Sequence, residues 1–155
     1  MEAIAFDHPM RIAVLGSGGV GGRLAAAGSE VTFIARGAHL DAIRRHGLRL
    51  TSALGDAHIV QAHAVETITD VGQVDLVIVA VKLWDTEEVA PSLRPLAERG
   101  VAVVSFQNGV QKDDLLRKHI PAESVMGGML HRRDHRGTGR HPPYRDNAAP
   151  SVWRV

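Results

Sequence analysis

The sequence of 155 residues predicts an α/β domain built on a doubly wound parallel sheet, and three observations lead to it. Four apolar residues, 12–15, run directly into the pattern G-x-G-x-x-G formed by Gly16, Gly18 and Gly21. A β-branched and aromatic run, 31–35, follows within one short helix length. Beyond it, apolar runs alternate with segments of helical spacing. That alternation is typical of parallel strands joined by right-handed helical crossovers.

The glycine pattern lies between a predicted strand and a predicted helix, which is the setting of a dinucleotide-binding turn. In such turns the first glycine permits a tight bend, the second lets the backbone approach a pyrophosphate, and the third lets helix and strand pack closely. The free N–H groups and the positive dipole at the helix start favour the phosphate charge. We therefore expect a dinucleotide pyrophosphate to lie against Gly16, Ser17, Gly18, Gly19, Val20 and Gly21.

Arg36 follows the second predicted strand, at the position where an NAD enzyme usually carries a carboxylate for the ribose hydroxyls. A guanidinium attracts and forks onto a 2′-phosphate, whereas a carboxylate repels it. The sequence therefore favours NADP(H) over NAD(H). The alternative is that Arg36 is a solvated charge at the end of a strand.

The elements after Arg36 can be placed from apolar spacing and from helix-ending residues. Pro91 lies in the second turn of one expected helix and weakens its start. His39 and His46 fall on a polar helix, so we expect them to be solvated and not ligands. In order, the expected elements are a helix over Ala38–His46 capped by Gly47, extended segments over Leu48–Thr51 and Ile59–Ala64, a buried strand over Leu76–Val81, a helix over Asp85–Glu98, a strand over Val101–Phe106, a turn at 107–109, a helix over Asp113–His119, and a strand beginning at Val125.

Composition excludes several classes of protein. The hydrophobic share is 45%, the mean hydropathy is −0.04, and no apolar run approaches the roughly 18–20 residues of a membrane span. Residues 1–9 lack the basic start and apolar core of a signal peptide, and we expect them to form a disordered extension. The absence of cysteine excludes disulfides and thiolate chemistry and agrees with the cytoplasm. We expect no metal site and no membrane partner, and the sequence gives no oligomeric state.

The last 26 residues differ from the rest of the chain. Residues 130–155 carry six arginines and two aspartates, with little apolar periodicity. A basic arm for nucleic acid is one interpretation. The other is a frameshift, because codons exist for residues 132–143 that yield AATIEAPGVIR when read one base later. We favour the frameshift, and so expect a domain over residues 10–129, an irregular tail over 130–155 and no nucleic-acid partner.

Five segments together resemble the N-terminal NADPH-binding domain of the ketopantoate reductase (2-dehydropantoate 2-reductase) family. They are MRIAVLGSGGVGG at Met10–Gly22, LAAAGSEVTFIAR at Leu24–Arg36, VIVAVKLWDT at Val77–Thr86, SFQNGV at Ser105–Val110 and VMGG at Val125–Gly128. The resemblance implies a Rossmann-type fold and NADPH-dependent reduction of ketopantoate to pantoate, on the route to pantothenate. It also implies that Lys82 lies beside the cofactor, and that Asn108 meets both cofactor and substrate.

The resemblance further implies a helical second domain that carries the catalytic lysine, and this sequence contains no counterpart of it. The phosphate helix is also short, about 19–27, where family members have roughly one turn more. We therefore expect a truncated homologue that is inactive alone, with no catalytic residue in this chain. Two alternatives stay open: a non-catalytic NADP-binding module or pseudogene product, and a Rossmann-type dehydrogenase of another 2-keto or 3-hydroxy acid.

Overall fold

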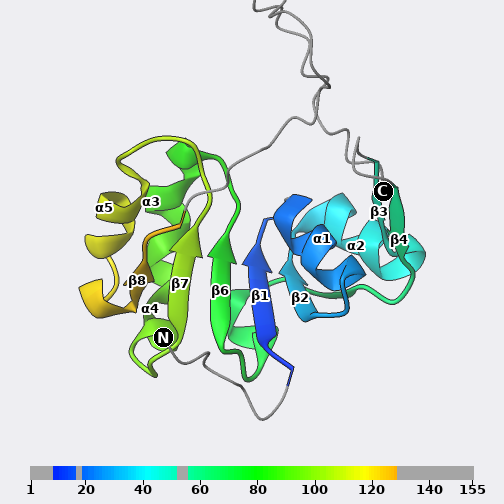
Figure 1. Cartoon of the computed structure of the whole chain (residues 1–155), viewed down its shortest axis with the longest axis horizontal. Helices are drawn as coiled ribbons and strands as arrows, with labels where there is room; N and C mark the ends of the chain where they lie inside the picture. Colours follow the sequence, from blue (N-terminus) through cyan, green and yellow to red (C-terminus); the bar gives the residue numbers. More distant parts are fainter. Residues whose placement is uncertain (1–8, 17–18, 52–55, 129–155) are drawn as a thin grey trace, which may run out of the picture.

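The computed structural model describes residues 9–16, 19–51 and 56–128, and its centre is a six-stranded parallel sheet (Figure 1). The strand order is β5-β2-β1-β6-β7-β8, the order of a Rossmann-type doubly wound fold, as the sequence predicts. The chain runs outward from β1 in one direction and returns to β6 to continue in the other. The strands are β1 (Arg11–Leu15), β2 (Glu30–Ile34), β5 (His63–Val65), β6 (Leu76–Val79), β7 (Ala102–Ser105) and β8 (Val125–Met126).

The remaining elements cover the sheet on its two faces. Figure 1 shows α1, α2 and a β-hairpin gathered near β1 and β2, and α3, α4 and α5 near β6 to β8. The hairpin consists of β3 (Leu48–Leu50) and β4 (Ala57–Ile59). The helices are α1 (Gly19–Ala26), α2 (Gly37–His46), α3 (Thr86–Val89), α4 (Arg94–Ala97) and α5 (Lys112–Arg117), with 3-10 turns η1 (Ile68–Val71), η2 (Leu83–Asp85), η3 (Ala90–Leu93) and η4 (Ala122–Ser124).

Strand β1 shows why the fold needs helices on both sides. Ile12 and Val14 belong to the core under α1 and α2, whereas Ala13 and Leu15 belong to the core under α3 and α4. Successive side chains of a strand point to opposite faces, so an uninterrupted apolar strand must be covered twice. All four side chains are buried.

Helix α1 is as short as the sequence predicts, and it ends in a defined cap. Gly28 has φ +93°, a left-handed conformation that costs glycine little. The N–H of Gly28 donates to the carbonyl of Ala25, and the N–H of Ser29 donates to the carbonyl of Leu24, at 3.0 Å each. This pair of bonds is the Schellman motif. Leu24 is partly buried in the core under α1, so the short helix still presents an apolar side chain to the sheet.

Two predicted elements are wrong in detail. The expected helix over Asp85–Glu98 is divided into η2, α3, η3 and α4, because Pro91 and Pro95 lack the N–H of an α-helical hydrogen bond and crowd the preceding turn. The expected extended segment over Ile59–Ala64 is interrupted by a turn at 60–61, so that its two ends join different sheets as β4 and β5.

An ion pair fixes the start of β1 against the loop that leads into β6. The guanidinium of Arg11 donates to both carboxylate oxygens of Asp75, at 3.1 and 2.7 Å, and the backbone N–H of Arg11 donates to the same carboxylate at 2.9 Å. Hydrogen bonding to Asp75 raises the pKa of Arg11 above its ordinary value, so the cation persists throughout the physiological pH range. This contact sets the register of the two central strands at the edge opposite the candidate site.

Several predictions fall on parts of the chain outside the described residues. These are the extension over residues 1–8, the two motif residues Ser17 and Gly18, and the tail from residue 129 onward. Within the described ranges, no helix has the length and apolar character needed to cross a bilayer.

Candidate functional site

A pocket of about 310 Å³ opens at the carboxyl ends of the three central strands β2, β1 and β6. The carboxyl edge at the reversal of strand order is where open α/β sheets bind ligands. Polar side chains reach the pocket from both sides of β1, from the segment after β2 and from the segment after β6. Six of its lining residues are Gly16, Arg36, His39, Val81, Asp85 and Glu88.

Gly16 lines the pocket at the point where β1 ends and the chain continues toward α1. Its φ of +99° lies in the region that favours glycine. A Cβ at this position would lie 3.1 Å from the backbone atoms of Ala80 and Val81, so a side chain would press on the chain that leaves β6. The N–H of Gly16 donates to the carbonyl of Ile34 at 3.2 Å. The first glycine therefore permits the tight turn predicted from the sequence.

Gly21 brings α1 directly onto the sheet. A Cβ on Gly21 would lie 2.7 Å from Cγ2 of Val14 and 3.1 Å from Cε1 of Phe33, two fully buried side chains. The close helix–strand packing predicted for the third glycine is therefore present. Gly19 and Val20 form the first turn of α1 beside it. Binding of a pyrophosphate at this turn stays a prediction.

Arg36 and His39 approach the pocket from the end of β2 and the start of α2. Arg36 is exposed and is the N-cap residue of α2, but its side chain makes no capping bond. His39 corrects part of an expectation: the residue is half-buried, and its Nε2 is buried with no hydrogen-bond partner among the described residues, so this nitrogen is not solvated. His46, seven residues later on the same helix, is exposed as expected. The sequence missed the burial of this nitrogen because amphipathic spacing does not show which atoms of a polar side chain become enclosed when the elements pack.

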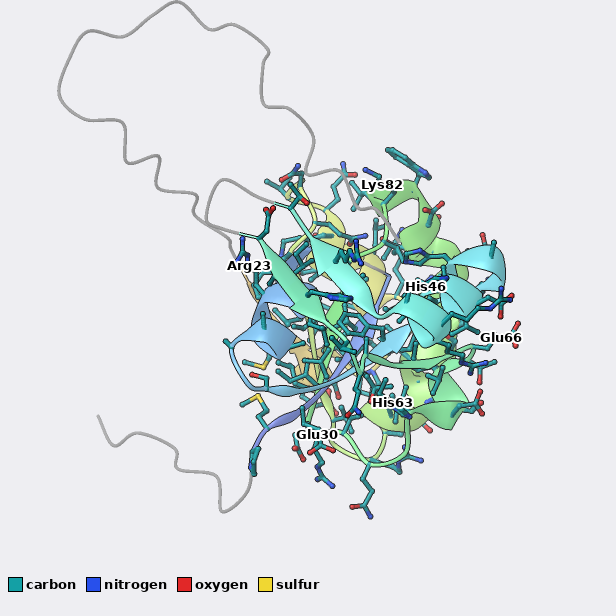
Figure 2. The ribbon with its side chains drawn as sticks, turned by 90° about the vertical axis from the view of Figure 1, so that its right-hand side faces the viewer. Arg23, Glu30, His46, His63, Glu66 and Lys82 are labelled. Atoms are coloured by element: carbon teal, nitrogen blue, oxygen red, sulfur yellow. The ribbon has the colours of Figure 1, made fainter. Side chains whose placement is uncertain are left out.

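Lys82 lies at the carboxyl edge, in the loop that follows β6. Figure 2 shows it at the opposite end of the molecule from Glu30 and His63, which begin β2 and β5. Lys82 is exposed, and its side chain has no ion pair or hydrogen bond with another described residue. Lys112 and Lys118, by contrast, pair with Asp113 and Glu87.

The loop after β7 carries Asn108 to the same edge. Asn108 is exposed, next to Gly109 with its φ of +111°. A Cβ on Gly109 would lie 3.2 Å from Cδ2 of Leu83, so this loop touches the loop that carries Lys82. The structure thus brings Lys82 and Asn108 onto adjoining loops, beside the strands whose ends form the pocket.

A hydrogen-bond network that sequence analysis did not find joins these two loops through Gln107. Its Nε2 donates to the carbonyl of Val81 at 2.7 Å and to Oγ1 of Thr86 at 2.8 Å. Its Oε1 accepts from Oγ of Ser105 at 2.8 Å, and its N–H donates to the same Oγ at 3.2 Å. Thr86 and Ser105 are fully buried. Buried polar groups require partners, so one glutamine fixes the spacing of both loops.

We expect Gln107→Ala to lower the free energy of unfolding by about 2 kcal/mol, because it leaves buried polar groups without partners, each worth roughly 1–3 kcal/mol. Gln61→Ala removes the same amide from an exposed turn and is the control. Urea denaturation of both variants measures the difference. Equal stabilities for the two variants would show that the network does not hold the loops.

Among the described residues, no group of three or more His, Asp or Glu side chains could hold a metal ion. The polar side chains that line the pocket are Arg36, His39, Asp85 and Glu88. A Rossmann-type sheet with a glycine turn beneath a pocket at the reversal of strand order defines a dinucleotide-binding class of protein.

Comparison with known proteins identifies the family. Residues 12–139 match the family described as ketopantoate reductase PanE/ApbA, and the chain belongs to that family. The match runs past residue 129, where we expected the domain to end. The family is one of nicotinamide-dependent oxidoreductases that act on CH–OH groups.

The individual relatives agree with this assignment. The 2-dehydropantoate 2-reductase of Halobacterium salinarum is 33% identical over 124 residues, which are 77% of this chain and 41% of that protein. A ketopantoate reductase structure from Ralstonia eutropha superposes with TM-score 0.66 at 36% identity, over 77% of this chain and 40% of that one. A D-mandelate dehydrogenase in complex with NADH and anilino(oxo)acetate has TM-score 0.66 at 28% identity, over 77% and 40%. The chain thus spans less than half the length of these relatives.

Proposed function

We propose that this chain is the NADP(H)-binding part of a reductase that converts a 2-keto acid, ketopantoate, to the corresponding 2-hydroxy acid, pantoate. The observation that carries the proposal is that Gly16 and Arg36 line one pocket at the reversal of strand order. Gly16 allows the backbone to bend beneath a ligand, and Arg36 supplies a cation that is free of any capping bond. Both features fit a phosphorylated dinucleotide.

The two loops beyond the pocket suit the reacting end of such a ligand. When bound, the reduced nicotinamide supplies a hydride to the carbonyl carbon, and the carbonyl oxygen takes up a proton. Lys82 offers a cation without a partner among the described residues, and Asn108 offers both a donor and an acceptor. We propose that Lys82 binds anionic groups of cofactor or substrate, and that Asn108 orients the carbonyl.

We also propose that the group that donates the proton comes from outside the described residues. Lys112 and Lys118 are held in ion pairs, and Lys82 is assigned to binding. The relatives are more than twice as long as the matched region, which leaves room for a second domain that closes the substrate site. The proposed setting is the cytoplasm, where a nicotinamide-linked metabolic reductase would work.

Two observations favour an alternative within the same reaction class, one for the substrate and one for the cofactor. The D-mandelate dehydrogenase that superposes on this chain is a 2-hydroxy acid enzyme in complex with NADH. Asp85 and Glu88 also line the pocket. Carboxylates accept hydrogen bonds from the ribose hydroxyls of NADH but repel the 2′-phosphate of NADPH. An NADH-dependent reductase of another 2-keto acid is therefore the alternative.

Calorimetric titration of the 155-residue chain with NADPH and with NADH tests the proposal. We expect NADPH to bind roughly ten times more tightly or better, the factor that one charge-assisted pair supplies. We expect only trace oxidation of NADPH on addition of ketopantoate, because we propose that the proton donor belongs to the second domain and not to this chain. Equal affinity for both cofactors would contradict the cofactor assignment. Rapid turnover would contradict the proposal that the proton donor belongs to a second domain.

A further inference from the structure

We propose that His39 is a second specificity-determining residue of the pocket, and that its imidazole hydrogen-bonds the phosphate ester on the adenosine ribose of the dinucleotide. The inference rests on the proposed function, because it names how one end of the same ligand is held. His39 lies three residues after Arg36, a spacing that places two side chains on the same side of a helix start. Both residues line the pocket.

The imidazole of His39 is the clearest unexplained polar group in the described part of the chain. Its Nε2 is enclosed and has no hydrogen-bond partner there. Buried polar atoms without partners are uncommon in folded proteins and often mark a ligand or water. A half-turn of the ring about χ2 exchanges Nε2 with Cε1 while the ring stays in place. The ring can therefore change the position of this nitrogen without repacking α2.

The start of α2 adds further donors on the same side of the pocket. The first N–H groups of any α-helix lack intrahelical partners, and the helix dipole makes that end positive. Helix α2 has ten residues, and the side chain of Arg36 leaves its N-terminus uncapped. A phosphate monoester here would meet a guanidinium, an imidazole and backbone N–H groups together. Such a set of donors matches three terminal phosphate oxygens better than it matches a pair of ribose hydroxyls.

The carboxylates that line the pocket explain why a second residue is needed. Asp85 and Glu88 line the pocket from the segment after β6, whereas Arg36 and His39 line it from the start of α2. The charge of the two carboxylates opposes a dianionic phosphate. Arg36 alone would meet that opposition with a single positive charge. The donors of His39 and of the helix start restore the preference for a phosphate on the α2 side.

The test compares His39→Ala and His39→Gln with His46→Ala, which removes an exposed imidazole from the same helix. The probes are NADPH, NADH and adenosine 2′,5′-bisphosphate, measured by calorimetry, with thermal melting to confirm folding. We expect His39→Ala to weaken NADPH and the bisphosphate about tenfold, as loss of a hydrogen bond to a charged group does, and to change NADH by less than about twofold. His39→Gln keeps a donor and restores most of the affinity, and His46→Ala leaves all three unchanged.

The probes separate failure of this inference from failure of the proposed function. If the unmodified chain binds NADPH, and His39→Ala weakens NADPH and NADH by the same factor or by none, His39 has no specificity role and the inference is overturned. If the unmodified chain binds the bisphosphate through His39 but not NADPH, the phosphate site stands and the reductase assignment fails. If it binds neither phosphate ligand, both proposals are overturned.

Discussion

Gly21→Ala is expected to destabilise the domain by about 1–3 kcal/mol and to weaken dinucleotide binding by roughly tenfold or more. The sign of the change in unfolding free energy is informative, because alanine in place of glycine ordinarily stabilises a helix interior by about 1 kcal/mol. Here the new Cβ would lie 2.7 Å from Cγ2 of Val14 and 3.1 Å from Phe33, so α1 must move away from the sheet. That movement displaces the first turn of α1, where the pyrophosphate is expected.

Urea denaturation and NADPH titration measure the two effects. Gly127→Ala is the matched control, since among the described residues its Cβ would find nothing closer than an oxygen of Asp113 at 3.9 Å. The double variant Gly21→Ala with Val14→Ala removes the two methyl groups that the Cβ meets, and we expect a favourable coupling between the two changes. A stabilising Gly21→Ala, or strictly additive changes in the double variant, would contradict the packing argument.

Arg36→Asp is expected to reverse the cofactor preference. The change removes a charge-assisted pair worth roughly 1.5–3 kcal/mol and places a carboxylate where a 2′-phosphate would lie, so NADPH affinity should fall by at least tenfold. NADH affinity should hold or rise, because a carboxylate at this position accepts hydrogen bonds from the ribose hydroxyls.

The control for Arg36→Asp is Arg99→Asp, which makes the same charge change just before β7 and therefore at the opposite edge of the sheet. Calorimetry measures the affinity of each variant for NADPH and for NADH. If Arg99→Asp lowers NADPH affinity as much as Arg36→Asp does, the effect is one of overall charge and Arg36 loses its assigned role.

These two predictions depend on positions that could be found from the sequence, because each one follows from a local rule. The glycine spacing requires a tight turn and a close helix, and the structure has the φ of Gly16 and the contact of Gly21 that the rule demands. Arg36 lies two residues after the end of β2. The central strands could be predicted equally well, since the continuous apolar runs of β1 and β6 are typical of parallel strands buried on both faces.

Local rules were less reliable where two signals competed. Pro91 and Pro95 outweighed the apolar spacing between α3 and α4, so a run of short helical turns replaced one helix. At residues 60–61 a turn separated β4 from β5, where the sequence predicted one continuous extended segment. In the first case the missing N–H of proline ended the helix, and in the second a reversal of the chain ended the strand. Average propensity over each segment did not predict either break.

The sequence by itself predicted the doubly wound parallel class of fold and the glycine turn, because periodicity and backbone freedom are properties of neighbouring residues. The pairing order of the strands came from the structure. Only the tertiary structure decided that Nε2 of His39 is enclosed and lacks a partner among the described residues, and that Gln107 joins the loop after β7 to the loop after β6. It also placed Asp85 and Glu88 in the same pocket as Arg36. These facts depend on contacts between segments far apart in the chain, and a hydrogen bond or a buried atom exists only once those segments meet.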